Sequence, residues 1–368
     1  MGYKQQMDFA IEKTKENTKI FKYVFPMSQS CNYNYRPEAC VEWTSGFFPG
    51  MEMLAYEYTK DEDFLACAKF HAEILRHRID NKIEVDNHDM GFLYSLACVS
   101  LYKVTGSEYA KETALLAADQ LITRYNPVGG FIRAWGDMQD ESANRLIIDC
   151  MLNIPLLYWA TEVTGDNKYK KVADAHLNTT INVIIRDNNT THHTYFFDLK
   201  TGVPLRGETA QGYSDDSCWA RGQAWGIYGA ALAYHYTKDN RLIEFFERVT
   251  GEFVKRLPED FVPYWDMDFA DGSGEPRDTS AAAIACCGIL EMCKHTGCEK
   301  YMPYVDYMMK SLAEKYTSAR LPYKSNVILT DGMYARTQGH EPEGTIFGDY
   351  FYMEALMRLL NNDWKMYW

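Results

Sequence analysis

The 368-residue sequence has few of the features that mark membrane, fibrous or nucleic-acid-binding proteins. Its longest apolar runs, such as AAAIACC at 281–287, are much shorter than the roughly 20 residues that span a bilayer. Glycine (24) and proline (12) are too scarce for a fibrous or disordered chain. It has no basic cluster, and 38 Lys and Arg against 51 Asp and Glu give a net charge of −13. This balance argues against nucleic acid as a partner.

Motifs for disulfides, metals and export are also missing. The ten cysteines are scattered without a CxxC pair, and we expect reduced, mostly buried thiols. We find no HExxH and no paired Cys/His spacing, so we predict no metal and no cofactor. Residues 1–17 lack the apolar segment of a signal peptide. These observations predict a cytoplasmic protein that does not interact with membranes and is a monomer or homodimer.

What the sequence does contain is an internal repeat. One four-residue turn element recurs five times, each time between two helical apolar patterns. Gly or Lys at the end of one helix, followed by Asp or Ser at the start of the next, is typical of a tight turn between two helices. The copies are Tyr58–Asp61, Val104–Ser107, Val163–Asp166, Tyr236–Asp239 and His295–Cys298.

The repeat predicts six helical hairpins. Its period is about 59 residues, and twelve periodic apolar segments follow one another, including one that begins near Arg145. Strand signals are confined to a small hairpin over 194–204. Six hairpins can stack as an open solenoid or close into a ring. Because no polar capping repeat is apparent, we predict an all-α (α/α)6 barrel forming one domain over residues 1–368.

The long connections indicate where a functional site lies. The short turns alternate with long loops, which in an up-down array all lie at the opposite end. The helices that follow these loops direct their N-termini to that end, which favours an anion. The loops are rich in Trp, His and carboxylates, a combination typical of a sugar site. The segments are 42–46, 86–89, 134–136, 145–149, 192–194, 218–225, 264–266 and 277–278.

Single residues of this set also have structural interpretations. A lone tryptophan more often packs in a core, and Asp89 and Asp278 occupy positions where Asp commonly caps a helix. Arg221 could bind substrate or pair with Asp215 or Asp216. Asp149 is different, because Leu146–Ile148 and Met151–Leu152 surround it with apolar residues in a predicted helix. Burying a carboxylate there is costly, and we favour a functional role.

Several longer segments resemble the unsaturated glucuronyl hydrolases of glycoside hydrolase family 88. They are DNHDMGFLYS, RLIIDCMLNIPLL, HHTYFFD, WARGQAWGIYG and GDYFYMEALMR, in family order. The resemblance implies an (α/α)6 barrel that removes the unsaturated uronic acid left by polysaccharide lyases at the non-reducing end of oligosaccharides. It implies that Asp149 is the general acid/base and Asp89 its partner carboxylate. The resemblance also implies a sugar pocket formed by Trp43, Trp135, His193, Gln211, Trp219, Arg221 and Trp225. We add His88, the residue before Asp89, to these predicted substrate-binding residues.

Three alternatives remain at this stage. The related family 105, the unsaturated rhamnogalacturonyl hydrolases, shares this fold and reaction. An inverting endoglycanase on the same barrel would place two carboxylates on opposite faces of a saturated substrate. A sugar-binding protein without catalysis would keep the tryptophans but would not need Asp149.

Overall fold

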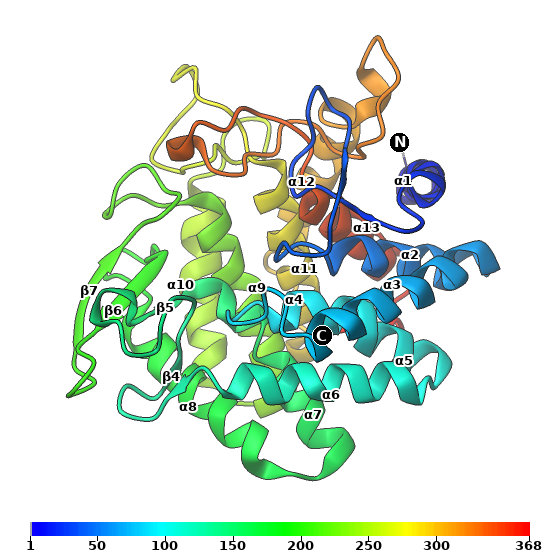
Figure 1. Cartoon of the computed structure of the whole chain (residues 1–368). Coiled ribbons are helices and arrows are strands. Elements are labelled where there is room, and N and C mark those ends of the chain that lie inside the picture. The colour runs from blue at the N-terminus through cyan, green and yellow to red at the C-terminus, as the bar shows by residue number, and fades with distance from the viewer. Residues whose placement is uncertain (1) are drawn as a thin grey trace.

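The computed structural model describes residues 2–368 and contains a ring of helical hairpins (Figure 1). Six helices form an outer layer, and six helical segments form an inner layer. The outer helices are α1 (Tyr3–Ile20), α3 (Glu62–Asp80), α6 (Glu108–Ile122), α8 (Asn167–Val183), α10 (Arg241–Lys255) and α12 (Met302–Lys315). The inner segments are α2 (Phe47–Thr59), α4 (Met90–Tyr94) with α5 (Ser100–Thr105), α7 (Pro155–Thr164), α9 (Ala220–Thr237), α11 (Thr279–Thr296) and α13 (Ile346–Leu360).

Burial distinguishes the two layers. Residues 220–233 of α9 and 346–358 of α13 are buried on every side, as the inner wall of a closed ring requires. Outer α10 buries only one stripe, which includes Leu242, Phe246 and Val249. The last helix, α13, packs against α1 and α2 and closes the ring, as the red and blue helices of Figure 1 show. The predicted (α/α)6 barrel is confirmed, and the open solenoid is excluded.

The predicted short turns are all present. Helices α2, α5, α7, α9 and α11 end at a left-handed residue, and Gly supplies this conformation without steric cost in three of the turns. In four turns, the Asp or Ser side chain then accepts a hydrogen bond from a backbone N–H in the first turn of the next helix. The capping residues are Lys60, Gly106, Gly165, Lys238 and Gly297.

The helix predicted from Arg145 was wrong. Residues Arg145–Ile147 form strand β5, which pairs with β6 (Thr194–Phe197), and β6 pairs with β7 (Pro204–Glu208). A 3-10 turn, Ile148–Leu152, follows, and α7 begins only at Pro155. Proline lacks the N–H that a helix interior needs and fits the first turn of a helix instead. Asp149 therefore lies on a short turn and not inside a helix.

The remaining regular structure is short. The strands β1 (Phe25–Pro26), β2 (Pro37–Glu38), β3 (Tyr125–Asn126) and β4 (Phe131–Ile132) form two-stranded ladders in the long loops. Further 3-10 turns cover Glu141–Ala143, Ser318–Arg320 and Arg336–Gln338. A π-helical segment, Ser95–Val99, interrupts the inner helix between α4 and α5. Within residues 2–368 no helix is both long and apolar enough to cross a membrane.

Candidate active site

Asp89, Asp149 and His88 come together at the loop-rich end of the barrel. The Nε2 atom of His88 lies 3.5 Å from Oδ1 of Asp89 and 3.5 Å from Oδ1 of Asp149. The ligand atoms of the three side chains all lie within 4.8 Å of one another. Asp89 and Asp149 are 13% and 20% exposed, whereas His88 is buried. The predicted carboxylate pair is thus close together and open to solvent on one side.

Local structure aims both carboxylates at this point. Asp89 occupies the N-cap position of α4, but its side chain makes no capping hydrogen bond, so the capping interpretation of Asp89 does not hold. Asp149 follows β5, and the N–H of Ile148 donates to the carbonyl of His193 at 3.1 Å. By contrast, Asp278 does cap its helix, because its Oδ1 accepts from the N–H of Ser280 at 3.1 Å.

A close backbone contact fixes the spacing between the two carboxylates. A Cβ atom on Gly91 would lie 2.3 Å from the Cα of Asn153, so only glycine fits at this position. The side chain of Asn153 accepts from the N–H of Phe92 at 2.8 Å. The start of α4, next to Asp89, is therefore held against the end of the turn that carries Asp149.

The electrostatic environment keeps a proton at this pair. Burial raises the pKa of Asp89 to about 7, although Arg78 and a hydrogen bond from Asn153 oppose the shift. Burial and the neighbouring Asp89 carboxylate raise the pKa of Asp149 well above its usual range. Burial and nearby positive groups lower the pKa of His88, so this imidazole is neutral. Oδ1 of Asp149 and both ring nitrogens of His88 lack a hydrogen-bond partner. The site is therefore a proton donor next to unsatisfied polar atoms.

Four predicted aromatic residues surround this end of the barrel. Trp135 is 37% exposed, and its ring lies edge-on to His88, with centroids 6.1 Å apart. Trp43 donates from Nε1 to the hydroxyl of Tyr334 at 2.8 Å. The rings of His193 and Trp219 lie 4.1 Å apart, and burial lowers the pKa of His193 to about 3. Because the His193 carbonyl accepts from Ile148, this second aromatic cluster connects directly to the turn of Asp149.

Arg221 does not pair with Asp215 or Asp216. Its guanidinium donates to Oδ2 of Asp278 at 2.8 Å and to Oε1 of Gln211 at 2.7 Å. It also donates to the carbonyls of Met333 and Tyr334, each at 2.5 Å. The side chain is 2% exposed, so Arg221 mainly connects three loops below the aromatic residues. Gln211 is held in the same cluster.

Trp225 occupies a different environment. It is 1% exposed and packs between Phe92 and Phe351, with ring centroids 5.4 and 5.5 Å away. Phe92 belongs to α4 and lies three residues after Asp89, so Trp225 supports the base of the site from inside the barrel. The structure places this residue among core aromatics.

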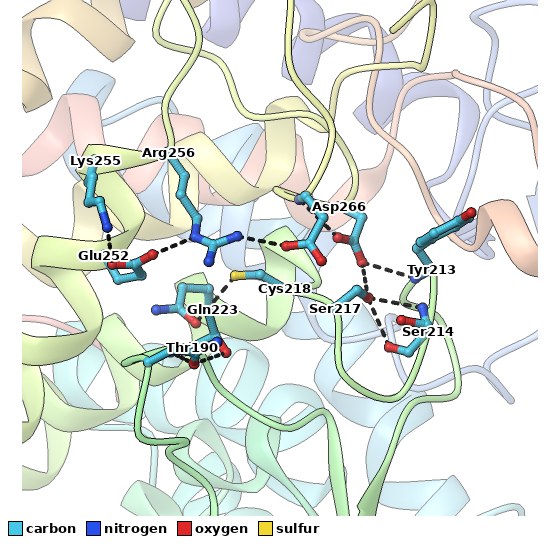
Figure 2. A network of polar contacts seen from close by, with 12 residues as sticks. Thr190, Tyr213, Ser214, Ser217, Cys218, Gln223, Glu252, Lys255, Arg256 and Asp266 are labelled. Carbon is cyan, nitrogen blue, oxygen red and sulfur yellow. Dashed lines mark hydrogen bonds and ion pairs between the residues drawn. The ribbon is translucent and has the colours of Figure 1, made fainter.

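A network of polar contacts holds the loop that leads into α9 in place (Figure 2). Oδ2 of Asp266 accepts from the N–H of Tyr213 at 2.9 Å and from the hydroxyl of Ser217 at 2.6 Å. Gln223 accepts from the N–H of Thr191 at 2.9 Å, which ties α9 to the segment that contains His193 and leads into β6. The loop before α9 is thus anchored on both sides.

Three residues that contact the site were not among the predicted site residues. Asn153 bonds to the carbonyl of Asp149, and Tyr334 holds Trp43. Arg145 lies over the ring of Trp135, with its guanidinium carbon 4.7 Å from the centroid, and its Nε has no hydrogen-bond partner. A signal existed only for Arg145 and Asn153, which lie within four residues of Asp149 in the sequence.

Comparison with known proteins assigns the family. The family model described as "Glycosyl Hydrolase Family 88" matches residues 18–356. The chain is 44% identical over 370 residues to the unsaturated chondroitin disaccharide hydrolase of Streptococcus pneumoniae, covering 99% of this chain and 93% of the relative. The chain belongs to glycoside hydrolase family 88. It is therefore an enzyme that hydrolyses glycosidic linkages, and the resemblance found in the sequence is confirmed.

Solved structures of family 88 have the same fold. The unsaturated glucuronyl hydrolase of Streptococcus agalactiae superposes with a TM-score of 0.96 at 44% identity, covering 100% of this chain and 93% of that one. A mutant of that enzyme complexed with dGlcA-GalNAc6S superposes with a TM-score of 0.88 at 41% identity, with the same coverage. The match to family 88 disfavours the family 105 alternative.

Proposed function

We propose that this family 88 enzyme removes the Δ4,5-unsaturated uronic acid from the non-reducing end of lyase-generated glycosaminoglycan oligosaccharides. The observation that supports it best is that Asp89 and Asp149 meet beside His88, where burial and the Asp89 carboxylate raise the pKa of Asp149. The names of the relatives point to an unsaturated chondroitin disaccharide as a preferred substrate.

The proposed reaction is the hydration of a vinyl ether. Asp149 donates a proton to C4, and water adds its oxygen to C5 as its own proton passes back to Asp149. One molecule of water is then added across the double bond, and the resulting hemiketal opens and releases the rest of the sugar. Only one positioned acid/base is needed, which suits a pair in which one carboxyl keeps its proton at neutral pH.

The geometry disfavours the inverting endoglycanase. That mechanism separates its two carboxyl groups by about 6.5–9.5 Å so that water can attack the opposite face of the sugar. Here one oxygen of Asp89 and one of Asp149 lie within 4.8 Å of each other, and Oδ1 of each residue lies 3.5 Å from Nε2 of His88. Trp43, Trp135, His193 and Trp219 offer rings for the sugar, and Arg145 supplies a guanidinium without an acidic partner at hydrogen-bond distance.

We further propose that residues 1–368 act as one catalytic domain, as a monomer or homodimer in the cytoplasm. The ten free cysteines of the structure suit a reducing compartment. Gel filtration with light scattering measures the oligomeric state.

The decisive experiment compares substrates. The purified protein is incubated with lyase digests of chondroitin, hyaluronan, heparin and pectin, and the loss of alkene absorbance is followed. We expect turnover of the chondroitin digest and none of a saturated glucuronide. A protein that cleaves the saturated glucuronide and leaves every lyase product intact contradicts the proposal.

A further inference from the structure

Two histidines and a glutamate converge at the opposite end of the barrel from the carboxylate pair. Nδ1 of His235 lies 3.1 Å from Nε2 of His295, and that nitrogen lies 2.8 Å from Oε1 of Glu291. Nδ1 of His235 and Oε1 of Glu291 are 3.4 Å apart and close the triangle. The proposed reaction does not use these residues.

The positions of the helices bring these side chains together. Glu291 and His295 are four residues apart on α11 and so share one face of that helix. His235 lies in the last turn of the adjacent helix, α9. Arg221 lies near the start of the same helix, 14 residues earlier, which corresponds to about 21 Å of helix. The cluster is therefore separate from the active site.

The distances fit the coordination of a metal ion. A tetrahedral ion with bonds of about 2.0–2.1 Å holds neighbouring ligand atoms about 3.3–3.4 Å apart. The three ligand atoms here lie 2.8, 3.1 and 3.4 Å apart, so the side chains need to separate only slightly to reach this geometry. We infer that His235, Glu291 and His295 form a binding site for a divalent transition-metal ion such as Zn²⁺.

The surroundings orient the ligands as a metal site requires. The second oxygen of Glu291 accepts from Arg358, which leaves Oε1 directed at the histidines. Glu291 is 3% exposed and His295 16% exposed, whereas His235 is 37% exposed and borders a groove of about 920 Å³. This opening gives an ion access and leaves a fourth coordination position for water. Nζ of Lys238 lies 3.4 Å from Nδ1 of His295, which is not the nitrogen that faces the cluster. The Lys238 side chain is exposed and can turn to solvent.

A second group of possible ligands, Glu52, Cys67 and His71, does not share these properties. His71 contacts Glu52 through Nδ1, at 2.9 Å. Its Nε2 lies 3.0 Å and 3.2 Å from the carbonyls of Phe21 and Val24, so both nitrogens are used within the protein. Both His71 and Glu52 are fully buried. This group is a closed structural ion pair.

Metal binding can be tested on the intact protein. The wild type and the variants His235→Gln and His295→Gln are dialysed against Zn²⁺ and analysed for bound metal, and Co²⁺ titration reports tetrahedral coordination by its visible absorption. His77→Gln is the matched control, because His77 is an exposed histidine in the last turn of α3. Circular dichroism confirms that each variant is folded.

We expect one equivalent of Zn²⁺ in the wild type and in His77→Gln, and at least tenfold weaker binding in both cluster variants. Tetrahedral Co²⁺ bands should appear only in the first two proteins. A wild type that retains no zinc, or cluster variants that retain the wild-type amount, would overturn the inference.

Discussion

Asp149 has an oxygen without a hydrogen-bond partner in a site that raises its pKa. Asp149→Asn keeps the shape of the side chain but cannot exchange a proton. We expect turnover to fall by about 10²–10⁴-fold, the usual contribution of general acid–base catalysis, while the substrate still binds. The measurement is turnover on an unsaturated disaccharide together with direct binding by calorimetry.

Asp137→Asn is the matched control, since Asp137 is an exposed aspartate in a loop at the same end of the barrel. It should keep wild-type turnover. If Asp149→Asn retains a tenth or more of the wild-type rate, Asp149 is not the acid/base.

Asp89 should control the pH dependence of the reaction. The negative charge of Asp89 helps to raise the pKa of Asp149, so Asp89→Asn lowers that pKa. Asp149 then loses its proton at a lower pH, and the alkaline limb of the turnover profile moves toward acid. Turnover is measured from pH 4 to 9 for the wild type and the variant. An alkaline limb that stays in place would show that Asp89 does not set the protonation of Asp149.

At the residue scale, the sequence carried information where the signal was local. Asp149 stood out because its apolar neighbours make a carboxylate costly there. The partners of Arg221 were not predictable, because Asp278 and Met333 lie 57 and 112 residues away along the chain. The burial of Trp225 has the same cause, since Phe92 and Phe351 come from distant hairpins.

At the scale of helices and turns, the five short connections were predicted because each depends on a few adjacent residues. The strand after Asn144 was not predicted correctly, because the apolar run of this segment fits a helix as well as a strand. Pairing with β6 decides between them, and the register of that pair is set by a strand almost 50 residues later.

Gly91 provides a test of how α4 and the Asp149 turn are spaced. Gly91→Ala places a methyl group against the backbone of Asn153 and should cost about 1–3 kcal/mol of unfolding free energy. Because the methyl group separates the two carboxylates, turnover should fall more than stability alone explains. Thermal melting and turnover at a temperature where the variant is folded measure the two effects.

Gly106→Ala is the comparison. Gly106 has a φ of +73° and no atom within 4 Å of an added Cβ, at the far end of the same interrupted helix. It should lose about 1 kcal/mol through backbone strain and keep its turnover when folded. Equal loss of turnover in both variants would argue against a role for the Gly91 contact in the site.

For the whole molecule, we expect turnover to be insensitive to reductants and chelators. The cysteines of the structure are unpaired, and the His235 cluster lies far from Asp149. Dithiothreitol should change neither turnover nor the melting temperature. EDTA should lower only the melting temperature, because an ion bound to the folded state stabilises it by mass action. Loss of turnover on EDTA treatment, restored by a divalent ion, contradicts this expectation.

The repeat predicted the number of hairpins, but it contained no direct evidence for ring closure. Closure depends on the fit between α13 and the first hairpin, which no local pattern records. The absence of capping repeats favoured closure, and the resemblance to family 88 implied the same closed barrel.

Ring closure also has a consequence for biosynthesis. Phe47 of α2 and Phe347 of α13 pack with ring centroids 6.2 Å apart, although 300 residues separate them in the chain. At about 5–20 residues per second, a ribosome finishes α13 roughly 15–60 s after α2 emerges. Throughout that interval the apolar surface of α2 lacks one of its native partners. The nascent chain therefore presents a binding surface for holding chaperones until the last hairpin is made.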